Sequence, residues 1–143
     1  MRRELVAGLA VATLSCGLEI QEAVYPDAPA ARTAGAFERG WLPEVIPEDA
    51  RDIVERHDLD TNETWACFTT PSGGESVRRK LVQLGAKRVS WLGGDGPGRP
   101  WWPDEMTRET LEAYAFSESG RLVVTVALAR DERMACLMRR VHS

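Results

Sequence analysis

The chain has 143 residues, which is enough for one domain with a single hydrophobic core. Its hydrophobic share of 43% and charged share of 28% are ordinary for a globular protein, and its formal net charge is −4. This negative balance excludes a global positive field that would attract nucleic acid, so we expect no nucleic-acid partner.

The first sixteen residues have the pattern of an export signal. Arg2 and Arg3 form a short positive segment, and residues 5–14 form an apolar stretch too short to span a bilayer. Cys16 follows in a position that suggests lipoprotein processing, although Thr13 stands where a lipobox usually has an aliphatic residue. The alternatives are simple cleavage, or an amphipathic helix with Cys16 as a buried thiol. We therefore predict a protein of the cell envelope, on the periplasmic side, held to the membrane by a lipid anchor if Cys16 is modified.

Residues 17–36 are rich in Ala and Pro and show little periodicity. This composition favours a tether or an extended lead-in. We accordingly divide the chain into a signal peptide at 1–16, the tether at 17–36 and one domain at 37–143.

Two strands are predicted at the start of this domain, at 51–59 and 64–70. Asp60, Thr61 and Asn62 supply turn chemistry between them, which predicts a hairpin. A helix over 48–57 is the competing interpretation.

A helix is predicted next. Ser72 and Glu75 have the spacing of a capping box, with Ser72 as the N-cap. Val77, Leu81 and Leu84 then lie on one helical stripe, and a glycine ends the helix.

The last part of the chain is predicted to be mainly strand. A Gly- and Pro-rich loop at 93–103 and a short helical turn at 104–110 precede strands at 111–116, 122–130 and 133–141. The predicted fold class is α+β: a single small domain whose antiparallel sheet consists of a hairpin and, after the helix, a three-stranded meander. One main helix packs on that sheet.

The segment His57-Asp58-Leu-Asp60-Thr-Asn-Glu63 is a candidate metal site. Asp58, Asp60 and Asn62 match the first alternate positions of a calcium-binding loop, but Glu63 stands where that loop needs Gly. His57 and Asp58 are similar to the paired ligands of metal phosphohydrolases, which need further histidines, and the chain has only two. Side-chain-to-backbone bonds in a hairpin turn explain these residues better, so we predict no metal and no other cofactor.

Trp101, Trp102 and Arg99 form a candidate ligand-binding group in the Gly-rich loop. Flat rings beside a guanidinium can stack on a sugar, a proline or a lipid headgroup. The alternative is that the rings fold inward and pin the loop to the sheet.

Cys67 and Cys136 both lie in predicted strands. In an oxidising compartment they can form a disulfide between neighbouring strands. Two buried thiols are the alternative, because sequence does not give the distance between them.

Catalytic motifs are missing from the sequence. It contains no G-x-S-x-G elbow, Cys67 has no evident base, and no Lys-Ser/Thr follows the glycines at 93–98. We predict no catalytic residue and expect a protein that is not an enzyme.

Residues 37–70 carry a specific motif. It reads Arg39-Gly-Trp-Leu-Pro43, then Pro47, Ala50, Asp52 and Ile53, then His57 to Asn62, Trp65 and Phe68. This motif resembles that of small exported bacterial proteins of uncharacterised activity that are YbbD head-domain-like. Ile46 and Asp49 depart from it, since the pattern often has Leu and Ser there. The resemblance implies an envelope protein, and no catalytic residue is carried over from it.

These observations predict an exported, lipid-anchored envelope protein that binds another envelope protein or a small ligand without catalysis. Two alternatives remain. One is a metal-dependent hydrolase that uses His57, Asp58 and Asp60. The other is a periplasmic inhibitor or immunity-type protein, since such proteins are small, acidic and exported.

Overall fold

The computed structural model describes residues 20–91 and 96–142. The predicted export signal, Cys16 and part of the predicted Gly-rich loop lie outside these residues. The strands are β1 (Ile20–Asp27), β2 (Arg51–Asp58), β3 (Thr64–Thr69), β4 (Lys87–Trp91), β5 (Leu111–Ser117), β6 (Leu122–Leu128) and β7 (Met134–Val141). The helices are α1 (Ala28–Thr33), α2 (Glu75–Gln83) and α3 (Asp104–Arg108). Within the described ranges, no helix is both long enough and apolar enough to cross a membrane.

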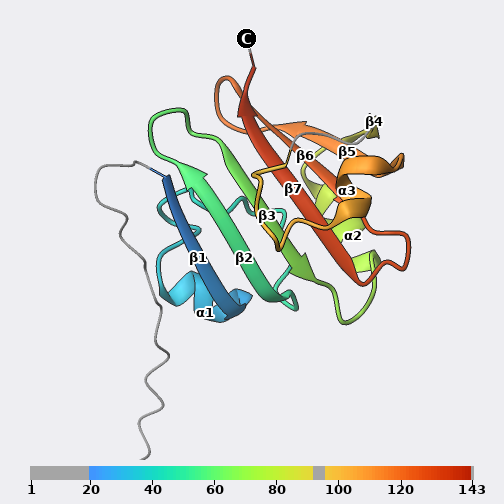
Figure 1. Cartoon of the computed structure of the whole chain (residues 1–143), viewed down its shortest axis with the longest axis horizontal. Coiled ribbons are helices and arrows are strands. Elements are labelled where there is room, and N and C mark those ends of the chain that lie inside the picture. Colours follow the sequence, from blue (N-terminus) through green and yellow to red (C-terminus); the bar gives the residue numbers. More distant parts are fainter. Residues whose placement is uncertain (1–19, 92–95, 143) are drawn as a thin grey trace, which may run out of the picture.

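All seven strands belong to one antiparallel sheet with the order β1-β2-β3-β7-β6-β5-β4 (Figure 1). Two meanders, β1 to β3 and β4 to β7, lie side by side and are joined where β3 pairs with β7. The chain must therefore return from β3, in the middle of the sheet, to β4 at its far edge. The connection that makes this crossing contains α2.

One face of the sheet, which we call the α1–α2 face, carries the larger core. Strand residues alternate between the two faces, so alternate side chains of strands such as β3, β6 and β7 enter this core. The helices α1 and α2 and the segment 34–50 cover it. Its buried side chains include Ile53, Ala66, Phe68, Val126 and Leu137 from the strands, Ala31 from α1, Val45 and Ile46 from the segment, and Val77 and Leu81 from α2.

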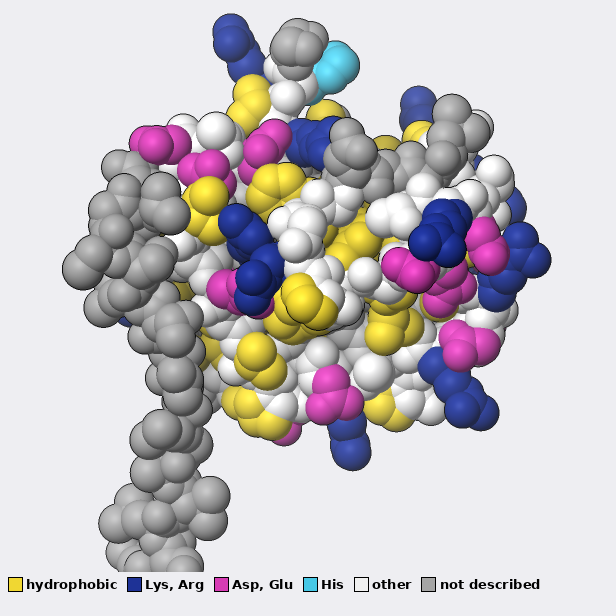
Figure 2. All heavy atoms as spheres, in the orientation of Figure 1, with side chains coloured by type: hydrophobic (Ala, Val, Ile, Leu, Met, Phe, Trp, Pro, Cys, Tyr) yellow, Lys and Arg dark blue, Asp and Glu magenta, His cyan; other side chains and the backbone are white. Residues whose placement is uncertain are grey.

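The opposite face, which we call the α3 face, carries a second core covered by α3 and residues 96–103. Trp91, Trp102 and Met106 pack there against the centre of the sheet. The indole Nε1 of Trp91 donates a hydrogen bond of 2.9 Å to the carbonyl of Met106, which fixes α3 to the end of β4. Hydrophobic side chains stay visible on this side of the molecule between acidic and basic ones (Figure 2).

A disulfide between Cys67 and Cys136 lies in the second core. The two residues are directly opposite each other on β3 and β7, with their Cα atoms 4.1 Å apart. Of the two states that the sequence leaves open, the structure therefore has the bonded one.

Much of the predicted secondary structure is present. The two early strands with the turn between them, the helix after them, the short helix at 104–108 and the three late strands all form. The sheet is larger than predicted, however, because β1 and β4 extend it at both edges. The single main helix is only partly confirmed, since α2 is the longest of three short helices in the described ranges.

The expected tether at 17–36 differs most from the structure, which places residues 20–36 inside the domain. The carboxylate of Asp27 accepts a hydrogen bond of 2.8 Å from the backbone of Ala30 and so caps α1. Ala28 and Ala31 are fully buried against the sheet. The small side chains that suggested a tether let this helix approach closely, and a proline in its first turn costs no intrahelical hydrogen bond.

The predicted capping box does not form either. The helix α2 begins two residues later than the box requires, and its N-cap is Gly74, which has no side chain to accept a hydrogen bond. The hydroxyl of Ser72 instead donates to the carboxylate of Asp49. A contact with a distant segment has replaced the local one.

We predict that the disulfide stabilises the domain by about 2–4 kcal/mol, because it links residues 69 apart and so restricts the unfolded chain. Urea unfolding of the oxidised protein and of the Cys67→Ala/Cys136→Ala variant should show a lower midpoint for the variant. Reductant should lower the midpoint of the wild type and leave that of the variant unchanged. Equal midpoints for the oxidised and reduced wild type would contradict the prediction.

Candidate functional site

The predicted turn at residues 58–63 does not assemble a metal site. The carboxylate of Asp58 accepts hydrogen bonds from the backbone of Asp60 at 2.9 Å and of Thr61 at 3.3 Å, and Asn62 has a positive φ of 59°. His57 points into the α1–α2 core, so the next side chain on the strand, Asp58, lies on the other face. In the described parts of the chain, no three His, Cys, Asp or Glu residues are grouped so that they could hold a metal ion.

A buried ionisable pair, Glu55 and His57, lies beside this turn. The side chains occupy successive inward positions on β2 and are 0% and 3% exposed. The Nδ1 atom of His57 is 2.7 Å from Oε2 of Glu55, and the Trp41 ring stacks on the imidazole with ring centroids 4.6 Å apart. The atoms Oε1 of Glu55 and Nε2 of His57 have no hydrogen-bond partner in the described structure. The pair has the composition of an acid–base couple, but it is closed to solvent.

The two halves of the sequence motif meet around this pair. Arg39 lies 4.8 Å from the centre of the Trp41 ring, and Arg139 of β7 donates to the carbonyl of Gly40 and, at 3.0 Å, to the hydroxyl of Thr64. The stacking of Trp41 on His57 and the hydrogen bonds of Arg139, which lies outside the motif, therefore hold the segment at 39–43 against β2 and β3. Sequence reasoning missed this cluster; its one signal was a glutamate two residues before His57, on the same face of a predicted strand.

Burial shifts the proton equilibria in this cluster. Desolvation raises the pKa of Glu55 above its ordinary value, and the interactions with His57 and Arg139 oppose that shift. Burial and the charge of Glu55 also raise the pKa of Tyr25 to about 12, with Arg39 acting in the opposite direction.

The candidate ligand-binding tryptophans hold the 96–103 segment against the sheet. Trp102 is 6% exposed, and its ring centre lies 6.5 Å from that of Trp91. The half-buried Trp101 donates from Nε1 to Glu22 at 2.7 Å, and Arg99 forms an ion pair of 2.9 Å with the same carboxylate. Both Trp101 and Arg99 therefore connect this segment to β1. Trp102 is folded inward against the sheet, which is the alternative to a ligand-binding role.

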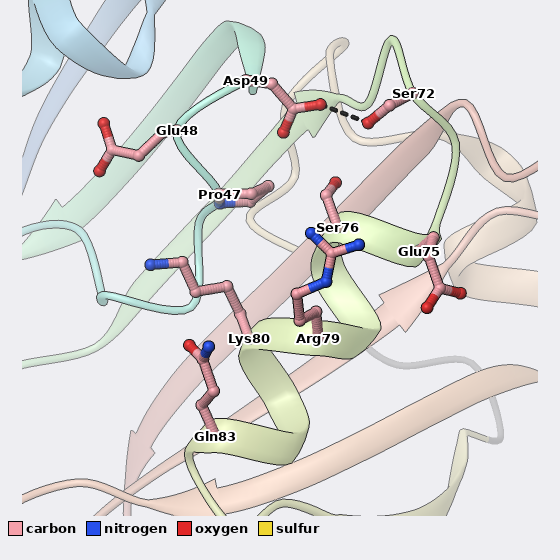
Figure 3. A pocket seen from close by; sticks show the side chains of 9 residues that line it. All are labelled: Pro47, Glu48, Asp49, Ser72, Glu75, Ser76, Arg79, Lys80 and Gln83. Carbon is pink, nitrogen blue, oxygen red and sulfur yellow. Dashed lines mark hydrogen bonds between the residues drawn. The ribbon is translucent and has the colours of Figure 1, made fainter.

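An open groove of about 480 Å³ lies between α2 and the segment 47–49 (Figure 3). Ser76, Arg79, Lys80 and Gln83 line it from the helix, and the hydrogen-bonded Ser72 and Asp49 lie at one end. Sequence reasoning missed the groove, because its second wall comes from a segment more than twenty residues before the helix. The polar positions i, i+3, i+4 and i+7 of α2 were the available signal.

The helix wall of this groove is fixed to the sheet by Arg78. Its Nε and Nη2 atoms each donate to Glu112 at 2.9 Å, and it also pairs with Glu132. The hydroxyl of Tyr114 donates to Glu112 at 2.6 Å. The Arg78 guanidinium, aided by this hydroxyl, lowers the pKa of Glu112 to about 2.

Residues 19–69 match the family model of the YbbD head domain. The matched segment contains β1, α1, β2 and β3, and therefore includes the buried pair and the turn. The resemblance predicted from residues 37–70 is confirmed, and the match begins earlier, at the start of β1. No curated protein and no solved structure matches the chain.

We predict that Glu55→Gln changes the pH dependence of stability. A carboxyl whose pKa is raised on folding keeps its proton longer in the folded protein, so its contribution to stability falls as the pH rises above its ordinary value of 4.5. The wild-type unfolding free energy, relative to that of the variant, should therefore decrease between pH 4 and pH 6 in urea titrations. The exposed Glu38→Gln is the control, and a difference that does not vary with pH would speak against the raised pKa.

We predict that Glu112→Gln changes the pH dependence of stability in the opposite direction. The lowered pKa of Glu112 means that its stabilisation is fully present above pH 4.5 and is lost as the pH falls toward 2. We expect the variant to lose about 1–2 kcal/mol at neutral pH and little at pH 2, measured by thermal unfolding across this range. Asp104→Asn, which breaks an exposed pair of 3.7 Å with Arg108, should cost less than about 0.5 kcal/mol. An equal loss at both pH values would rule out the charged interaction as its cause.

Proposed function

The chain carries a YbbD head-domain-like segment at residues 19–69, and we propose that it is an exported, lipid-anchored protein of the cell envelope that binds a partner without catalysis. The observation that carries the proposal is the disulfide between Cys67 and Cys136. Stable disulfides belong to oxidising compartments, so this bond supports export through the signal-like sequence at residues 1–16.

The geometry of the ionisable residues supports binding over catalysis. Glu55 and His57 are sealed beneath Trp41, so a substrate cannot reach them without displacing that ring. Asp58 is occupied by the backbone of its own turn. A hydrolase that uses His57, Asp58 and Asp60 therefore receives no support from their placement, whereas the groove along α2 is open.

Because the domain already begins at β1, the proposed lipid anchor would determine which end of the sheet faces the membrane. Only residues 17–19 separate Cys16 from β1, and the four residue steps from Cys16 to Ile20 span at most about 14 Å. Ile20 pairs with Asp58, so the turn at 58–63 lies at the same end of the sheet as the start of β1. An acylated Cys16 would hold this end near the membrane and direct α1, which follows the far end of β1, away from it.

The test is the intact mass of the protein from the native membrane fraction. We expect a chain that begins at Cys16 and carries acyl groups, with Cys67 and Cys136 alkylated only after reduction. Cys16→Ser should release the protein from the membrane fraction, and Cys67→Ala/Cys136→Ala should leave it there. An unmodified chain that begins at Met1, with thiols alkylated before reduction, would refute the proposal.

A further inference from the structure

We propose that the groove between α2 and residues 47–49 binds a carboxylate carried by a peptide, with Arg79 and Lys80 as the counter-charges. This inference rests on the proposed binding function and gives it a site and a ligand class. It is carried by five features of the groove: its cations without an ion-pair partner, a buried hydroxyl without a hydrogen-bond partner, the N-terminus of α2, the placement of the acidic residues, and the volume.

The first feature is a pair of cations without a carboxylate partner. Arg79 and Lys80 are adjacent on α2, and neither forms an ion pair with another described residue. The neighbouring Arg78 is fully engaged with Glu112 and Glu132, which leaves the next two positive charges for the groove. The groove is also lined by Glu48, which is paired with Arg32, and by Asp49 and Glu75, so the attraction for an anion is local to the α2 stripe where Arg79 and Lys80 lie.

The second feature is the hydroxyl of Ser76. Its Oγ atom is buried and has no hydrogen-bond partner among the described residues, although buried polar groups are nearly always satisfied. Ser76 lies one turn before Arg79 and Lys80, so the three side chains share one stripe of the helix. A change of the Ser76 χ1 rotamer would turn this hydroxyl toward the groove, where a ligand oxygen would accept from it.

The start of α2 adds to the same preference. The helix has nine residues, and no side chain caps its N-terminus. Its first backbone N–H groups therefore give this end a partial positive charge. Ser76, in the first turn, lies at this end of the groove.

The acidic residues at the groove favour a singly charged anion over a doubly charged one. Glu48 forms an ion pair of 2.7 Å with Arg32, and Asp49 accepts from Ser72. In Figure 3 the carboxylates of Glu48 and Glu75 point away from the centre of the groove. Three nearby negative charges disfavour a doubly charged phosphate more than a singly charged carboxylate.

The volume of the groove favours a peptide as the molecule that bears the carboxylate. A volume of about 480 Å³ lies within the range that holds a ligand of many atoms and exceeds what one carboxylate fills. The amide of Gln83, at the far end of the same helical stripe, can bond to a peptide backbone. A short peptide with a free carboxylate therefore fits both the charge and the length of the groove.

The test is a titration of the isolated protein with N-acetyl-Ala-Ala, which has a free carboxylate, followed by ¹H–¹⁵N NMR. We expect saturable shifts of the α2 amides with this peptide and none with N-acetyl-Ala-Ala-amide. Equal shifts with both peptides, or none with either, would overturn the proposal. Sodium acetate should bind at least about tenfold more weakly than the peptide, and equal affinity would overturn the peptide as the carrier.

Matched variants test the residues. Arg79→Ala/Lys80→Ala should weaken peptide binding at least about tenfold, and Ser76→Ala should weaken it severalfold. The control Lys87→Ala/Arg121→Ala removes two exposed positive charges outside the groove and should change the affinity less than about twofold. An equal loss of peptide affinity in the two double variants would mean that the net charge of the protein, and not the groove, causes the effect. This result would overturn the proposed site. An export failure with peptide binding intact would refute the envelope location alone, and the reverse result would refute this inference alone.

Discussion

The pairing of β3 with β7 joins the two meanders into one sheet, and both cores are built across it. Six residue pairs connect these strands. On one face the Cys67–Cys136 bond crosses the junction, and on the other Phe68 packs in the same core as Leu137. Arg139 reaches from β7 to the carbonyl of Gly40, so a residue of the second meander helps to close the buried cluster of the first. The segment that matches the family model, residues 19–69, is thus completed by a strand outside the match.

This arrangement gives the sequence motif an architectural explanation. Trp41 stacks on His57, Asp58 and Asn62 shape the turn, and Arg39 covers the Trp41 ring. These contacts bring a proline-containing segment against two strands and exclude water from Glu55. A motif whose residues suggest metal binding or acid–base catalysis thereby encloses the buried pair Glu55 and His57. The open groove between α2 and residues 47–49 lies outside this cluster.

The groove follows from the topology. Because β3 lies in the middle of the sheet and β4 at its edge, the chain must cross a face, and α2 makes that crossing. The apolar stripe of α2, with Val77 and Leu81, faces the core, so its polar stripe is turned toward segment 47–49. Arg78 fixes the helix in this position through Glu112. One short helix therefore serves both the core and the groove.

The sequence by itself determined the elements whose signals are local: the strands β2, β3 and β5 to β7, the turn at 58–63, and most of α2. Alternating side chains, turn residues and a helical stripe depend on neighbours a few positions away. Only the tertiary structure decided the rest. The exposed strand β4 forms through its pairing with β5, and α1 is a helix inside the domain because its alanines are buried in the core on one face of the sheet. Ser72 joined Asp49 instead of capping α2, and residues far apart in the chain enclosed Glu55 and formed the groove, since such contacts depend on positions that no local pattern encodes.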